Sequence, residues 1–223
     1  MKNLILRFIR LILGLILFAT GMCLTIQANL GRAPWDVLHH GISLVTGLTI
    51  GQGNITMSVV VLTIGLLLKE KIGVGTLCNA FLVGNFLDMV MATGLIPKMQ
   101  GFIPGLLMLI AGMVVMSFAS YFYIGSGFYA GPRDLLMVSL TKKTGKPLGL
   151  IRNSIELVAF IAGFFLGGQY GIGTLLYALL LGPIMQFVFR LFHFDVKTIP
   201  QDSLKDTASR IRKQFPQGVQ GYK

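Results

Sequence analysis

The stretch Gly73-Val74-Gly75-Thr76-Leu77 decides the fold, because it recurs 98 residues later as Gly171-Ile172-Gly173-Thr174-Leu175. The same offset places residues 11–92 on residues 109–190 without a gap. Chance rarely aligns so many Gly and Pro residues in register. The chain therefore contains one unit twice. This internal repeat sets the architecture within which the single helices are interpreted.

The composition is that of a membrane protein. Of 223 residues, 54% are hydrophobic and only 12% are charged, about half the charged share of a typical soluble domain. Six apolar runs predict six membrane-spanning helices in an all-α polytopic fold. They cover residues 5–28, 54–68, 73–95, 102–128, 154–168 and 172–193. We expect a first membrane repeat at 1–100, a second at 101–194 and a basic cytoplasmic tail at 195–223.

The net charge of +11 follows the membrane topology. With a cytoplasmic N-terminus and six crossings, 17 of the 19 Lys and Arg residues face the inside, and only Arg32 and Lys98 face the outside. This asymmetry is the positive-inside pattern. It predicts a multi-pass protein of a bacterial inner membrane with both termini in the cytoplasm. Anionic membrane lipids are the expected partners of the basic residues, and nucleic acid is not expected.

Each repeat also contains a short helical segment, at 34–45 and at 132–143. Each starts with Pro, which suits a first helical turn, and ends before a Thr-Gly stop. Asp36 and Asp134 lie in the first turns, where the helix dipole favours a carboxylate. About twelve residues span only ~18 Å, too short for roughly 30 Å of hydrocarbon, so each segment is re-entrant or interfacial. Three true crossings per repeat then predict that the two repeats are inverted.

Polar residues inside a bilayer are costly, and they form the list of candidate binding residues. Arg152 stands where the first repeat has Asn54, and Glu156 stands where it has Ser58. Equivalent positions that carry different side chains in the two repeats can bind one ligand from two chemically different sides. Two helix N-termini with arginines nearby suit an anionic group. The predicted substrate-binding residues are Asn29, Asp36, Asn54, Arg133, Asp134, Arg152 and Glu156.

Two structural alternatives stay open at these positions. Asp36 and Asp134 are also explained as anchors of the helix starts. Arg152 and Glu156 lie four residues apart on one helix and can neutralise each other. In the tail, apolar residues at helical spacing within 203–215 indicate either an amphipathic surface helix or a solvated segment.

No metal, cofactor or catalytic pattern is visible. His39 and His40 are adjacent and point to different faces, and no third ligand lies at a useful spacing. Cys23 and Cys78 share no pattern with the other repeat, which predicts buried inert thiols. Neither a nucleophile–base pair nor a phosphate-binding Walker motif is found. We therefore expect no cofactor, no bound metal and no enzymatic activity.

The stretch 28–39 with the Gly-x-x-Pro-x-Asp element, the segment 46–51 and the stretches 73–77 and 79–84 resemble the YczE branch of the YczE/YyaS/YitT bacterial membrane proteins. The similarity covers about residues 8–193. This resemblance implies a bacterial inner-membrane protein, and it supplies neither a substrate nor functional residues.

Repeats of this kind are typical of secondary transporters, whose site lies where the repeats meet. The sequence thus predicts a transporter or exporter of a small polar, anionic metabolite. The alternative is a membrane accessory, sensor or scaffold protein without transport. A small-molecule substrate is the expected partner besides lipid, and assembly into a homo-oligomer is left open.

Overall fold

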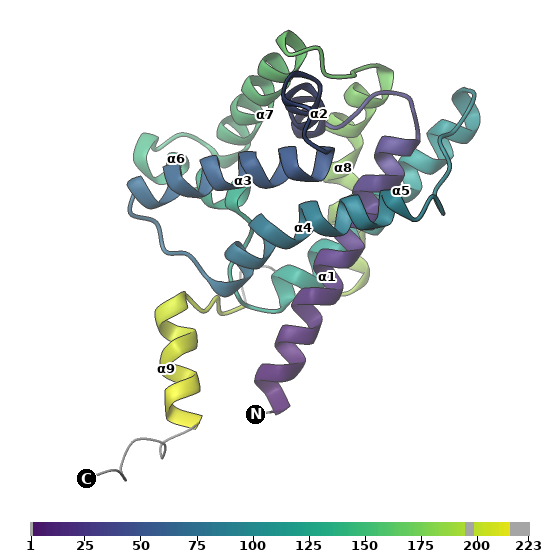
Figure 1. Ribbon diagram of the computed structural model, residues 1–223. Coiled ribbons are helices and arrows are strands. Elements are labelled where there is room, and N and C mark those ends of the chain that lie inside the picture. The colour runs from purple at the N-terminus through teal and green to yellow at the C-terminus, as the bar shows by residue number, and fades with distance from the viewer. Residues whose placement is uncertain (1, 195–198, 215–223) are drawn as a thin grey trace.

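The computed structural model describes residues 2–194 and 199–214, in which every regular element is an α-helix (Figure 1). In chain order the helices are α1 (Lys2–Gln27), α2 (Pro34–Thr46), α3 (Ile50–Leu67), α4 (Val74–Ala92), α5 (Phe102–Gly125), α6 (Pro132–Thr144), α7 (Leu148–Phe165), α8 (Ile172–Leu191) and α9 (Leu204–Gln214). The all-α prediction is confirmed within this part of the chain.

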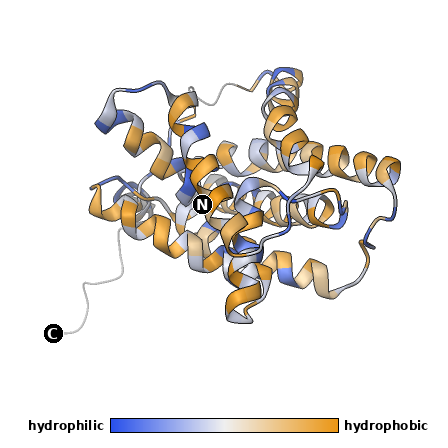
Figure 2. Ribbon diagram, turned by 90° about the horizontal axis from the view of Figure 1, so that it is seen from above, coloured by the Kyte–Doolittle hydropathy of each residue, from blue (hydrophilic) through white to orange (hydrophobic). Residues whose placement is uncertain are grey.

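Five of these helices are long and apolar enough to cross a membrane: α1 from Leu4, α3, α4, α5 and α8. Helix α7, with 18 residues and the charged pair Arg152 and Glu156, is not among them. Large apolar side chains are exposed on many helices, and Figure 2 shows most helical ribbon in hydrophobic colours. Such a surface is stable in lipid and unfavourable in water.

The two short helices form where the sequence predicts them. Pro at the first turn begins each helix, and Gly47 and Gly145 end them with φ angles of 75° and 66°. This left-handed conformation suits glycine, because a side chain would clash there. The first half of α2, from Pro34 to His39, is buried, whereas its last residues are exposed. Helix α2 therefore starts in the interior and ends at the surface.

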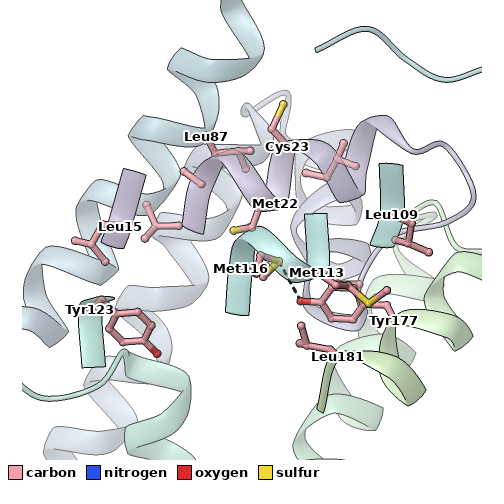
Figure 3. Packing of buried hydrophobic residues seen from close by; sticks show 14 of the residues in the cluster. Leu15, Met22, Cys23, Leu87, Leu109, Met113, Met116, Tyr123, Tyr177 and Leu181 are labelled. Atoms are coloured by element: carbon pink, nitrogen blue, oxygen red, sulfur yellow. Dashed lines mark hydrogen bonds between the residues drawn. The ribbon is translucent and has the colours of Figure 1, made fainter. Parts of the chain in front are cut away.

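Helices α1 and α5 pack antiparallel and form the centre of the main core. Gly14 lies against Tyr123, Gly21 against Met116, and Gly112 against Thr25, so partners descend along α5 as positions rise along α1. Figure 3 shows the side chains of this core, including the hydroxyl of Tyr177 directed to the sulfur of Met116. Glycines at the crossing let the two backbones approach closely, as is common between membrane helices.

The two halves exchange equivalent contacts. The amide of Gly75 donates to the carbonyl of Phe128 over 2.8 Å, and the amide of Gly173 donates to that of Leu30 over 2.7 Å. Both donors and both acceptors are 98 residues apart in the sequence. Helix pairs behave in the same way, because α2 packs on α7 as α6 packs on α3, and α4 packs on α1 as α8 packs on α5. The pairs α2 with α7 and α6 with α3 cross between the halves, and the pairs α4 with α1 and α8 with α5 repeat the same packing within each half.

Helix α9 is tied to the start of α1 by the residues that precede it. The buried carboxylate of Asp202 accepts from Arg7 at 2.6 Å and pairs with Arg210 at 3.0 Å. The amide of Leu204 donates to the carbonyl of Ile72. Of the two alternatives for 203–215, the structure has the helix, as Leu204–Gln214, and residue 215 lies outside the described residues.

Candidate functional site

The site is built on the N-terminal turn of α2, which is buried, and on that of α6, in which Arg133 and Asp134 are half-buried. The N-cap residue of α2, Ala33, has no side chain that can accept from the first amides. Gly131 leaves the start of α6 without a side-chain cap in the same way. The first-turn carboxylates supply negative charge instead, as the helix dipole favours. Asp134 also accepts a hydrogen bond of 3.1 Å from the hydroxyl of Tyr123 on α5.

A hydrogen bond between His39 and Arg133 joins the two short helices. The Nη2 group of Arg133 lies 3.2 Å from Nε2 of His39, whose side chain is fully buried. The guanidinium of Arg133 also lies over the ring of Trp35, 4.7 Å from its centroid. On the other side of the imidazole, Nδ1 lies 3.2 Å from Oδ1 of Asp36. The order Asp36, His39, Arg133 thus runs from one half of the chain into the other.

Arg133 and Arg32 lack an anionic partner. Among the described residues, no carboxylate oxygen lies within 4.0 Å of either guanidinium. Arg32 is only 8% exposed, and its Nε and Nη1 atoms have no hydrogen-bond partner. Arg152 differs, because its Nε donates to Glu156 over 3.1 Å. The two guanidiniums without a carboxylate in direct contact are therefore at the starts of the short helices, where Asp36 acts on both from a longer distance, and not on α7.

The structure brings most of the predicted binding residues to this region. Asp36, Arg133 and Asp134 lie in the first turns of α2 and α6. Asn54 is 3% exposed and follows Gly53, which packs on the carbonyl of His39. The pair of α7 lies within electrostatic range, since Glu156 acts on Arg133 and Arg152 acts on Asp134.

Asn29 lies apart from this group and has contacts of its own. Its side chain donates to the carbonyl of Met99 and accepts from Gln169, at 3.2 and 3.3 Å. It joins the end of α1 to the connections before α5 and α8. Its binding role, like that of the other six predicted residues, stays a prediction.

The set of predicted binding residues contains none of four side chains that the structure places in the site: Arg32, Trp35, His39 and Tyr123. One signal was available: Trp35 and Arg133 occupy equivalent positions of the repeated Pro-x-Asp element, 98 residues apart, and differ completely in chemistry. In the structure these two side chains stack on each other. The described residues contain no group of three or more His, Cys, Asp and Glu side chains that could hold a metal ion.

A pocket of about 430 Å³ leads toward this region from one side. Three lysines, Lys69, Lys71 and Lys142, line it, and Asp134 and Tyr129 contribute to its wall. Lys142 pairs with Glu70 at 2.9 Å. The pocket is therefore of mixed character, with three lysines, two carboxylates and several uncharged side chains, and it extends to Asp134 at the start of α6.

The sequence matches a family model over residues 5–190, described as a family of unknown function (DUF6198). The chain belongs to this family. The match includes both short helices and every residue of the candidate site. Membership and the apolar helices together identify the chain as a multi-pass membrane protein.

Three relatives share most of their length with the chain. An uncharacterized membrane protein of Bacillus subtilis (strain 168), YczE, is 34% identical over 188 residues, which are 83% of this chain and 86% of the relative. An uncharacterized protein of Haemophilus influenzae is 30% identical, covering 81% and 82%. The Bacillus subtilis protein YyaS is 27% identical, covering 79% and 89%. The resemblance to the YczE and YyaS proteins is thus confirmed. No solved structure matches the chain.

Proposed function

We propose that the chain is a secondary transporter of a small anionic solute, which binds at Arg133 between two inverted halves of the protein. The observation that carries the proposal is a guanidinium at the meeting point of two helix starts with no carboxylate within 4.0 Å among the described residues. A neutral imidazole and an indole face are its contacts.

The energetics favour an anionic ligand at this position. Arg133 is half-buried, so its charge is partly withdrawn from water, which costs free energy when no anion pairs with it. The cation–π contact with Trp35 returns about 0.5–2 kcal/mol. A carboxylate, sulfonate or phosphate would supply the missing charge and accept several guanidinium hydrogen bonds at once. Arg32 lies near the start of α2, is buried, and also has no carboxylate within 4.0 Å among the described residues.

The exchanged contacts support inverted halves. A two-fold axis produces such pairs, in which residue i of one half meets residue j of the other and the reverse also holds. The equivalent helices α1 and α5 run antiparallel, so an axis relating them lies across their length. If α1 crosses the membrane, this axis lies in the membrane plane, which is the arrangement of many transporters with broken helices. The buried start of α2 favours a re-entrant helix over an interfacial one.

The lysine-lined pocket supports access from one side. Its lysines belong to segments that the positive-inside rule places in the cytoplasm, together with both termini. Figure 1 has the start of α1 and helix α9 on the same side of the molecule. We assign this structure to a conformation that is open toward the cytoplasm of a bacterial inner membrane. Alternating access would close this pocket and expose the start of α2 near Arg32 to the outside.

Thermal unfolding of the purified chain in lipid nanodiscs tests the proposal. The probes are phosphate, sulfate, methanesulfonate, acetate and succinate, and the signal is circular dichroism. At least one probe should raise the melting temperature of the wild type, since a ligand stabilises the state that it binds. The Arg133→Gln variant should lose this response, and Arg190→Gln, at an exposed position of α8, should keep it. A wild type that responds to no probe favours the accessory or scaffold function.

A further inference from the structure

The hydrogen bond between the short helices fixes the protonation state of His39. A guanidinium carries only donors, so Nε2 of His39 has to accept the hydrogen bond from Arg133. The proton of the neutral ring therefore lies on Nδ1, which faces Oδ1 of Asp36 at 3.2 Å. Both atoms are buried and neither has a hydrogen-bond partner. A small rotation of the ring would form a hydrogen bond between them.

A second proton on His39 cannot coexist with this arrangement. It would occupy Nε2 and turn the contact with Arg133 into two donors and two positive charges 3.2 Å apart. The imidazolium would at the same time attract the carboxylate of Asp36 more strongly. Protonation thus moves His39 toward Asp36 and separates it from Arg133.

Apart from Asp36 and Arg133, the helices packed around His39 contribute no charged group that acts on it. Asp36 on its own helix and Arg133 on α6 are the charged groups that act on it. Helix α3 contributes Gly53 and Asn54, neither of which has an ionisable side chain. The charged residues of α7, Arg152 and Glu156, are paired with each other.

We propose that His39 is the proton-binding site of a proton-coupled transporter, in which one proton enters with each anion. This inference rests on the proposed function. Protonation releases the Arg133 guanidinium, which then lacks its acceptor and gains the most from an anion. The anion in turn offsets the repulsion between Arg133 and the imidazolium. Each ligand therefore raises the affinity of the other, and a monovalent anion would be carried without net charge.

Trp35 provides the measurement, because it is the only tryptophan of the chain. Its ring centroid lies 6.4 Å from that of His39, and a charged imidazole quenches indole emission. In nanodiscs, the emission of the wild type should fall on acidification along a one-proton curve. His39→Gln should abolish this titration. The variant with both His40→Gln and His193→Gln, in which His39 is the only histidine, should retain it.

Sulfate at constant ionic strength is the probe for coupling. It should move the emission midpoint to higher pH in the wild type and not in Arg133→Gln. Above the midpoint, sulfate affinity should fall about tenfold per pH unit, the slope for one linked proton. In the variant with His39 as its only histidine, a ¹⁵N spectrum should report the same midpoint, which keeps the test valid if His39→Gln does not fold.

Two outcomes would overturn the inference. One is a wild-type emission that does not titrate, or that titrates unchanged in His39→Gln. The other is sulfate binding that does not depend on pH. The second result would leave an anion transporter without proton coupling, so it separates failure of this inference from failure of the proposed function.

Discussion

Arg133 donates to His39 over 3.2 Å, and this contact links residues that are 94 positions apart in the two halves of the chain. A hydrogen bond to a charged group contributes about 1.5–3 kcal/mol, a range that a ligand or a proton can overcome. The bond therefore can hold one conformation and still be broken in a transport cycle.

Residues 98 and 143 test the inverted topology. In a background with Cys23 and Cys78 replaced by Ala, Lys98→Cys should react with an impermeant maleimide added outside intact cells. Lys143→Cys should react only after the cells are opened. The reason is that an odd number of crossings separates the two connections if the halves are inverted. Labelling of both residues from the same side of the membrane would contradict the inverted arrangement.

The close approach of α7 to α2 can be tested at Gly163. A Cβ atom there would lie 2.6 Å from Cα of Leu38, so Gly163→Ala should destabilise the protein by about 1–3 kcal/mol. Gly149→Ala on the same helix is the matched control, because its Cβ meets no atom within 4 Å. The control should be neutral or slightly stabilising, as expected for Ala in a helix. Equal melting temperatures for the two variants would argue against this packing.

Arg152 should prove to be a structural residue. Its side chain is 43% exposed and paired with Glu156 on the same helix, so the loss of this pair costs about 0.3–0.5 kcal/mol. Arg152→Gln and Glu156→Gln should keep the melting-temperature response to anions that Arg133→Gln loses. If Arg152→Gln loses the response while the protein still folds, the anion site lies on α7 and our assignment to Arg133 fails.

The contact of Asp202 with Arg7 should control the attachment of α9. Asp202→Asn removes the charge that holds both Arg7 and Arg210. Hydrogen exchange of the α9 amides should accelerate roughly tenfold or more, since hydrogen bonds to charged groups contribute about 1.5–3 kcal/mol. Asp206→Asn, which weakens only the helix cap formed with Ser203, should have a smaller effect. Exchange that is the same in Asp202→Asn and the wild type would show that α9 is held by other contacts.

Much of the fold could be predicted from local signals. Pro at the first turn and a Thr-Gly stop located α2 and α6 to within one residue at each end, because both signals act on the backbone of the element itself. The apolar runs located the long helices for the same reason. The ends of the third and seventh helices were less accurate; α3 begins at Ile50, four residues before the predicted start, because Thr49 and Gln52 form a capping box there.

The centre of the site could not be predicted in this way. His39 and Arg133 meet only because α2 and α6 start at the same place in the interior, and no periodic pattern encodes that meeting. Arg152 drew attention as a departure from the repeat, yet its neighbour Glu156 on the same helix compensates it. Arg133 also departs from the repeat, opposite Trp35, and its partners come from the other half of the chain.

Counterflow in proteoliposomes measures directly whether the protein transports an anion through a site at Arg133. Vesicles with the purified chain are loaded with the probe anion that stabilises the wild type most, and uptake of the same radiolabelled anion is followed from outside. We predict that the wild type and Arg190→Gln accumulate more labelled anion than empty vesicles, meaning vesicles without protein. Arg133→Gln should show no accumulation above that level. Wild-type uptake equal to that of empty vesicles, or full uptake by Arg133→Gln, would contradict an anion transporter whose site is Arg133.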